Sequence, residues 1–169
     1  MNQRKTYALI LVGASIWCGG IILPPLLHYW SGETIIETLI LKFYSHICHQ
    51  NSARSCTFFG APFAVCIRCS SVYFSFLCGV LLWNIFSRNA TFEKYFSALF
   101  SFPSVFIFAL PMLADVVARF IGLYNDEFSF YASRIVTGGL FGFSFAFALL
   151  PVFFSACEEL FPTKFLLKK

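Results

Sequence analysis

Long apolar runs constrain the fold of this chain more than any other feature. Each is long enough to cross the hydrocarbon core of a bilayer, which requires about 20 helical residues. They lie at about residues 7–29, 69–86, 95–113 and 135–156. Only 12% of the 169 residues are charged, whereas soluble domains carry roughly 25%. The sequence therefore predicts a single all-α domain, residues 1–169, that forms a polytopic membrane helical bundle of about four transmembrane helices.

A shorter segment, residues 33–47, separates the first two runs. Its apolar residues recur at helical spacing, but Glu33, Glu37 and Lys42 interrupt them. Because the segment is too short and too charged to span a membrane, we expect an interfacial or re-entrant amphipathic helix.

Prolines and glycines within the runs predict local features of the helices. Pro103 and Pro111 fall inside the third run and predict kinks there. Gly138 and Gly142 are four residues apart in the last run and permit close approach of another helix. We expect this pair to serve packing within the chain rather than a dimer interface.

The basic residues predict the orientation. Seven of the 12 Lys and Arg residues flank the run ends on the N-terminal side of the membrane, and five flank the opposite ends. The positive-inside rule then places both termini in the cytoplasm of a multipass protein of the plasma or inner membrane. The lipid bilayer is its expected partner. Nucleic acid is not, because no basic stripe is interleaved with stacking aromatics.

Four of the seven cysteines cluster between the first two runs, within 22 residues. In the predicted orientation this cluster lies at the outer face. Cys66 and Cys69 form a Cys-x-x-Cys pair, and Cys48 and His49 precede them. These four residues offer three sulfurs and one nitrogen, a set that suits tetrahedral zinc or another soft-ligand metal such as Cu(I).

The same thiols suit two other kinds of chemistry. Cys66 and Cys69 resemble the pair of membrane thiol oxidases and would then be the catalytic residues of a thiol-disulfide oxidoreductase. Cys48 or Cys56 would be the resolving thiol, and a quinone between the helices would accept electrons. In the metal site, Arg68 beside the thiols would lower their pKa and favour thiolate. Alternatively, permanent disulfides lock the outer loop, or the thiols contact a bound ligand.

Charged residues near the span ends are a second signal. Asp115 and Arg119 are four residues apart after the third run and predict a solvated pair. Arg134 begins the fourth run, where an unpaired charge at depth costs about 2.5–3.5 kcal/mol. We expect it either to snorkel outward or to pair with Asp115 or an anionic ligand beneath the cysteine loop. His28 ends the first run on the same face, where an interfacial role is commoner than ligation.

The chain resembles an uncharacterised prokaryotic family of membrane proteins. The resemblance rests on Cys48-His49-Gln50, Arg54-Ser55, Val65-Cys66-Ile67-Arg68-Cys69 and Tyr73, and on a later signature that contains Asp115 and Arg134-x-x-Thr-Gly. Ser70-Ser71, Cys56 and Arg119 depart from the usual pattern. The resemblance implies a small helical membrane protein whose Cys/His loop and Asp/Arg pair belong together, and it implies no substrate. We expect a ligand pocket formed by His28, Arg54, Arg68, Tyr73, Asp115 and Arg134.

These features leave three functions open. The first is a small multipass membrane protein with an outward-facing Cys/His site that binds metal or performs thiol redox chemistry. The second is a substrate-binding membrane subunit for uptake of a vitamin or cofactor such as cobalamin, working with a partner subunit, although four spans are fewer than the six usual in such subunits. The third is a structural or assembly factor with a disulfide-locked loop.

Overall fold

The computed structural model describes residues 3–50, 55–86, 102–122 and 127–160. Within them lie five helices and one two-stranded antiparallel sheet. The helices are α1 (Gln3–Ser31), α2 (Ile35–Ser45), α3 (Ile67–Phe86), α5 (Phe102–Phe120) and α6 (Glu127–Leu160), and the strands are β1 (Thr57–Phe58) and β2 (Ala61–Pro62). The predicted all-α membrane bundle is confirmed.

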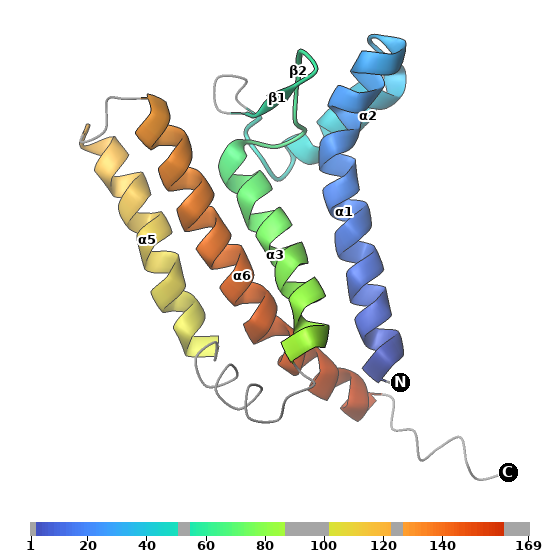
Figure 1. Cartoon of the computed structure of the whole chain (residues 1–169), viewed down its shortest axis with the longest axis vertical. Coiled ribbons are helices and arrows are strands. Elements are labelled where there is room, and N and C mark those ends of the chain that lie inside the picture. The colour runs from blue at the N-terminus through green and yellow to red at the C-terminus, as the bar shows by residue number, and fades with distance from the viewer. Residues whose placement is uncertain (1–2, 51–54, 87–101, 123–126, 161–169) are drawn as a thin grey trace, which may run out of the picture.

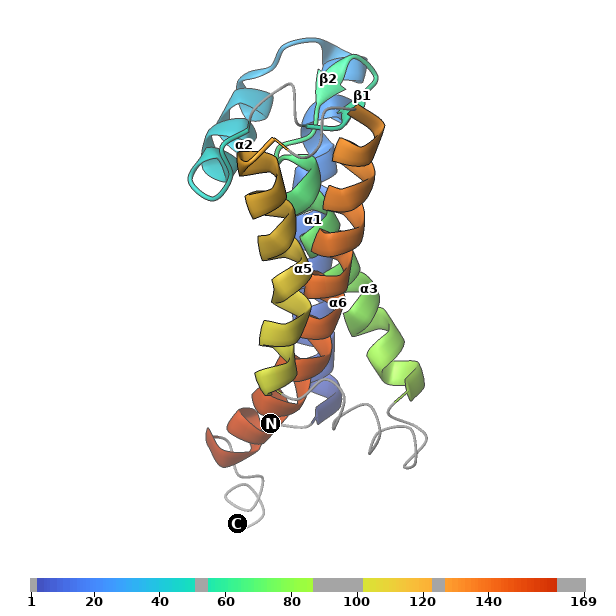
Figure 2. The same ribbon diagram turned by 90° about the vertical axis from the view of Figure 1, so that its left-hand side faces the viewer.

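The four long helices stand side by side and alternate in direction (Figures 1 and 2). The most extensive contact joins α3 to α6, and α5 packs on α6 while α1 packs on α3. Helix α2 and the small sheet lie together at one end of the bundle, opposite the end at which α1 begins and α6 finishes. The connection from α1 to α3, which contains the cysteine cluster, is therefore at the end where α3 starts.

Three of the described helices are long and apolar enough to cross a membrane. These stretches are Arg4–Ser31, Ile67–Phe86 and Tyr131–Cys157, and α5 contributes a shorter apolar stretch, Val105–Ala118. They correspond to the predicted spans at 7–29, 69–86 and 135–156. The predicted amphipathic helix at 33–47 is present as α2, which presents Ile36, Leu39 and Phe43 at the molecular surface.

The third span was predicted at residues 95–113, whereas α5 covers Phe102–Phe120. Residues 95–101 lie outside the described part of the chain. The prediction of a kink at Pro103 is wrong, because Pro103 is the second residue of α5, where the missing N–H has no intrahelical partner to lose. The later start also places Asp115 inside α5 rather than after it.

The glycine pair of α6 lies against α3, as predicted. A Cβ atom added at Gly138 would lie 2.9 Å from the carbonyl oxygen of Arg68, and one at Gly142 would overlap the carbonyl of Val72. The hydroxyl of Ser71 donates to the carbonyl of Ile135 across 2.6 Å. Helices α3 and α6 thus approach closely at the end of the bundle that holds the cysteine cluster.

Candidate metal and thiol site

Three cysteines converge where α3 begins. The Sγ atoms of Cys48, Cys66 and Cys69 all lie within 4.8 Å of one another. Cys66 immediately precedes α3, Cys69 lies in its first turn, and Cys48 follows α2. Cys48 is buried and the other two are half-buried. Sulfurs bound to one ion at about 2.3 Å are about 4 Å apart, so the cluster needs only small side-chain rotations to enclose a metal.

Backbone contacts of helix α1 bring the loop before Cys66 into place. Pro25 has no N–H, so the carbonyl of Ile21, four residues earlier, lacks its usual helical donor. The N–H of Ala64 donates to that carbonyl instead, across 3.1 Å. The loop is therefore hydrogen-bonded to α1 two residues before Cys66.

Gln50 fixes the loop that follows Cys48. Its side-chain amide donates to the carbonyl oxygens of Leu41, across 2.6 Å, and of Ala64, across 2.7 Å. Its backbone has φ 41°, a left-handed conformation that few residues other than glycine adopt. Gln50 thus joins α2 to the segment that leads into Cys66. Sequence reasoning assigned no role to Gln50, although its place in the Cys-His-Gln motif was the available signal.

Polar hydrogens surround the sulfurs of the cluster. The backbone N–H of Cys66 donates to Sγ of Cys48 across 3.1 Å. The thiol of Cys69 donates to Sγ of Cys66, and this hydrogen bond is the main reason that the pKa of Cys66 is lowered to about 5. Backbone N–H groups of Cys69 and Arg68 and the side chain of Cys48 also lower this pKa, whereas burial raises it. These contacts favour the thiolate of Cys66, which is the form that binds metals and attacks disulfides.

Two residues predicted near this chemistry lie apart from the three sulfurs. His49, the predicted fourth ligand, is exposed and does not belong to the group of converging ligand atoms. Neighbouring side chains diverge, so the turn that buries Cys48 directs His49 outward. Cys56 is half-buried outside the group, and burial raises the pKa of its thiol.

The carboxylate of Asp115 forms an ion pair with the guanidinium of Arg68, which joins α5 to α3. Asp115 is only 5% exposed, so the prediction of a solvated Asp115 is wrong. The prediction that the Arg68 side chain activates the thiols is also corrected. The guanidinium of Arg68 binds Asp115, and it is the backbone N–H of Arg68 that stabilises the Cys66 thiolate.

Arg134 is 7% exposed and therefore lies within the protein rather than snorkelling outward. His28, near the end of α1, has Nδ1 3.4 Å from Oε1 of Glu37 in α2. Tyr73 lies one helical turn beyond Cys69 and packs edge-on against Trp17, with ring centroids 5.7 Å apart.

The six residues predicted to form a ligand pocket therefore have different surroundings. Arg68 and Asp115 contact each other, whereas His28 contacts α2 and Tyr73 contacts α1. Arg54 lies outside the described residues.

A bundle of apolar helices with a thiol cluster at the head of one of them defines this molecule as a multipass membrane protein. The chain belongs to the DUF2085 family of predicted membrane proteins, whose model matches residues 48–148. The match begins at Cys48 and includes Cys66, Cys69, Asp115 and Arg134. The resemblance to an uncharacterised membrane-protein family is thereby confirmed.

A relative of known sequence covers nearly the whole chain. Uncharacterized protein MJ1492 of Methanocaldococcus jannaschii is 31% identical over 167 residues, which span 94% of this chain and 99% of the relative. No solved structure matches the chain.

Proposed function

We propose that this protein binds a soft metal ion, zinc or Cu(I), through Cys48, Cys66 and Cys69. The observation that carries the proposal is the convergence of three sulfur atoms within 4.8 Å from two separate segments of the chain. Soft thiolate ligands favour these two metals over magnesium or calcium, which prefer oxygen. Three protein ligands leave a fourth position of tetrahedral zinc for water, a ligand or His49 after rotation.

The start of α3 stabilises negatively charged sulfur atoms. The thiolate of Cys66 and the sulfur of Cys48 both accept backbone N–H groups, and the N-terminus of a helix carries a partial positive charge. These donors act on the ligands as outer-shell hydrogen bonds do in known metal sites, where they orient the ligands and hold them in place. Burial of Cys48 keeps one ligand away from solvent.

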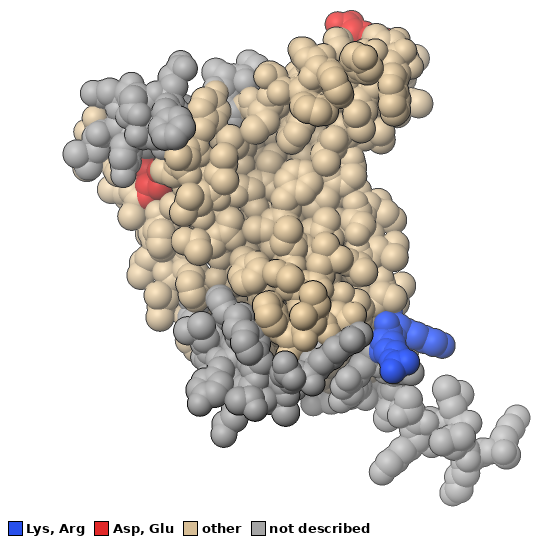
Figure 3. Space-filling model, in the orientation of Figure 1, with Lys and Arg blue, Asp and Glu red and all other residues tan. Residues whose placement is uncertain are grey.

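We place the site at the outer face of the plasma or inner membrane, with both termini cytoplasmic. On the face shown in Figure 3, Lys and Arg gather at the end where α1 begins, and Asp and Glu lie toward the other end. The orientation itself rests on the count of basic residues over the whole chain, seven on the side of the termini against five on the other, to which the positive-inside rule applies. The exposed apolar side chains of α2 would then lie in the membrane interface.

A membrane thiol-disulfide oxidoreductase is the second candidate. It is favoured by the thiolate of Cys66 at the head of a helix, with the thiol of Cys69 directed at it. Oxidation would join the Sγ atoms of the Cys66 thiolate and the Cys69 thiol, releasing one proton from Cys69 and two electrons. A quinone would accept both electrons, together with that proton and a second one from water, to become a quinol. Cys48, adjacent to both, would be the resolving thiol.

Metal analysis combined with thiol counting separates the two functions. Detergent-purified full-length protein is equilibrated with Zn²⁺ or Cu(I), freed of loosely bound ions and analysed for metal and for alkylatable thiols. Metal binding predicts one ion per chain, lost in Cys66→Ser and Cys69→Ser but retained in the matched control Cys78→Ser, whose thiol is exposed on α3. Metal-free protein with a reducible Cys66–Cys69 bond would overturn the metal proposal and support the oxidoreductase.

A further inference from the structure

The three sulfur atoms of the thiol cluster differ in the hydrogen bonds that they accept. Sγ of Cys48 accepts the backbone N–H of Cys66 across 3.1 Å, and Sγ of Cys66 accepts backbone N–H groups of Cys69 and Arg68. Within the described part of the chain, no backbone N–H donates to Sγ of Cys69. In the metal-free protein this sulfur is instead a donor, because its thiol hydrogen-bonds to Cys66.

Metal binding removes the hydrogen of the Cys69 thiol. A cysteine that binds a metal ion is a thiolate, so Cys69 changes from a donor to an acceptor when the ion is bound. Cys48 and Cys66 have backbone donors for this state, whereas none of the described backbone groups serves Cys69. Cys69 is half-buried, and a charged acceptor away from water is costly to leave without a donor. The metal-bound site therefore needs a further donor beside Cys69.

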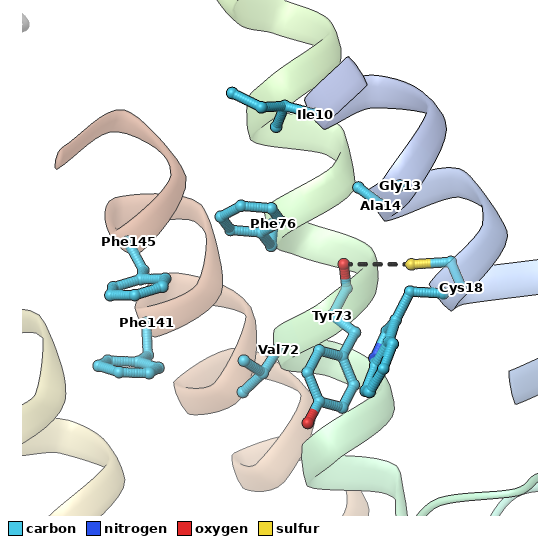
Figure 4. A pocket seen from close by; sticks show the side chains of 10 residues that line it. Ile10, Gly13, Ala14, Cys18, Val72, Tyr73, Phe76, Phe141 and Phe145 are labelled. Atoms are coloured by element: carbon cyan, nitrogen blue, oxygen red, sulfur yellow. Dashed lines mark hydrogen bonds between the residues drawn. The ribbon is translucent and has the colours of Figure 1, made fainter. Parts of the chain in front are cut away.

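Tyr73 is the residue placed to supply this donor. It follows Cys69 by four residues on α3, so the two side chains share one face of the helix. Helical side chains lean toward the N-terminus of their helix and cover the preceding turn. Figure 4, which views an apolar cavity lined by Tyr73, shows this direction: the hydroxyl points away from Phe76 and toward the start of α3. The phenol interacts electrostatically with all three sulfurs, and most strongly with that of Cys69.

The hydroxyl of Tyr73 is available for this role. In the hydrogen bonds of the described residues, the backbone carbonyl of Tyr73 accepts from the Cys18 thiol, but its hydroxyl takes no part. The ring itself is held in place, because it lies edge-on to the ring of Trp17 with centroids 5.7 Å apart. Tyr73 also packs against the buried group of residues that contains Cys48, as Cys69 does. A packed ring whose hydroxyl is not engaged can donate to a new acceptor without a large rearrangement.

We propose that Tyr73 is a positioning residue of the metal site, and that its hydroxyl donates to the thiolate of Cys69 when the ion is bound. The inference rests on the proposed metal-binding function and adds a residue to it. A phenol has one hydrogen to donate, so it serves one sulfur. The hydrogen bond stabilises the metal-bound thiolate over the protonated thiol and lowers the reactivity of the bound sulfur toward electrophiles.

Co²⁺ tests the inference, because it occupies the tetrahedral thiolate sites of zinc and shows sulfur-to-metal charge-transfer absorption. The detergent-purified full-length wild type should show this absorption band. Tyr73→Phe keeps the ring but removes the donor, so the band should move to longer wavelength and the affinity for Co²⁺ should fall about 10–100-fold. At saturating Co²⁺, alkylation mapped by mass spectrometry should become faster at Cys69 and stay unchanged at Cys66.

Tyr44→Phe is the matched control. Tyr44 also packs edge-on against Trp17, but its hydroxyl donates to the carbonyl of Trp17 across 2.7 Å. Its loss should leave the absorption band at the wild-type wavelength. Tyr73→Leu removes the ring as well as the hydroxyl and separates the packing of Tyr73 from its hydrogen bond.

The possible failures are distinguishable. An unshifted band and wild-type affinity in Tyr73→Phe would overturn the inference and leave the metal-binding function standing. The same conclusion follows if Tyr73→Leu changes the band and Tyr73→Phe does not, because the ring alone would then matter. Absence of sulfur-to-metal absorption in the wild type would instead contradict the proposed function, and the inference with it.

Discussion

The N–H of Ala64 donates to the carbonyl of Ile21, which Pro25 leaves without its helical donor. A proline inside a helix usually weakens it, but here the freed carbonyl accepts from the loop that leads to Cys66. The end of α1 thus helps to fix the position of Cys66 relative to Cys48 and Cys69.

Replacing Pro25 with alanine should loosen the thiol cluster. Alanine returns an N–H that competes with Ala64 for the carbonyl of Ile21, so the loop loses a bond worth about 1 kcal/mol. We expect faster alkylation of Cys66 in metal-free protein, measured by mass spectrometry over time. Pro151→Ala, in α6 and far from the loop, is the control. An unchanged rate in Pro25→Ala would show that the loop is held by other contacts.

Gln50→Ala should impair the site more than His49→Ala. The Gln50 amide donates to two carbonyls, whereas His49 is exposed. Loss of both bonds should lower metal affinity about 10–100-fold, as loss of outer-shell partners does elsewhere. Competition with a chelator measures the affinity. Gln50→Glu should behave like Gln50→Ala, because a carboxylate cannot donate; wild-type affinity in Gln50→Glu would argue against the role of the amide.

The thiolate of Cys66 should be detectable in the pH dependence of its alkylation rate. Its pKa is lowered to about 5, first of all by the thiol of Cys69, so alkylation in metal-free protein should be half-maximal near pH 5 and level by pH 7. A depressed pKa contributes stability that is present above the unfolded pKa of a thiol, declines below it and is lost as pH falls through about 5. Cys69→Ala, which removes the donor, tests the cause and should move the alkylation midpoint of Cys66 to higher pH. An alkylation midpoint near pH 8 in the wild type would contradict the proposed hydrogen bond.

Breaking the buried pair of Arg68 and Asp115 should destabilise the fold. Asp115→Leu leaves the guanidinium of Arg68 without the carboxylate that it contacts, and such changes cost about 3–5 kcal/mol. A thermal melt followed by circular dichroism should shift to lower temperature. The double variant Arg68→Met, Asp115→Leu should recover much of the lost stability, because it removes both charges and leaves neither of them buried without the other. No recovery in the double variant would show that the residues do not act as a pair.

Sequence patterns predicted the helical elements well where the bilayer dictates them. An apolar run of about 20 residues has few alternatives to a helix in a membrane, so α1, α3 and α6 were found near their observed bounds. The third run was harder to delimit, because apolar residues continue without a polar boundary from 95 into α5. For the same reason the sequence predicts Pro103 as an interior residue of the span, whereas it is the second residue of α5.

The site was predictable only in its local part. Cys66 and Cys69 are three residues apart at a helix start, so spacing alone places them together. Cys48 joins them through contacts distant in sequence, and nothing in the pattern showed that it would turn inward while His49 turns outward. Asp115 had Arg119 as a neighbour in sequence, but the packing of α3 beside α5 and α6 pairs it with Arg68.

Metal-edge X-ray absorption tests the central claim most directly, because it counts the sulfur atoms bound to the ion. In the zinc- or Cu(I)-loaded wild type we expect three sulfurs at about 2.3 Å, and two in Cys48→Ser, since Cys48 is the ligand that only the folded structure supplies. A shell of nitrogen and oxygen alone, or three sulfurs retained without Cys48, would contradict the assignment of Cys48, Cys66 and Cys69 as the metal ligands.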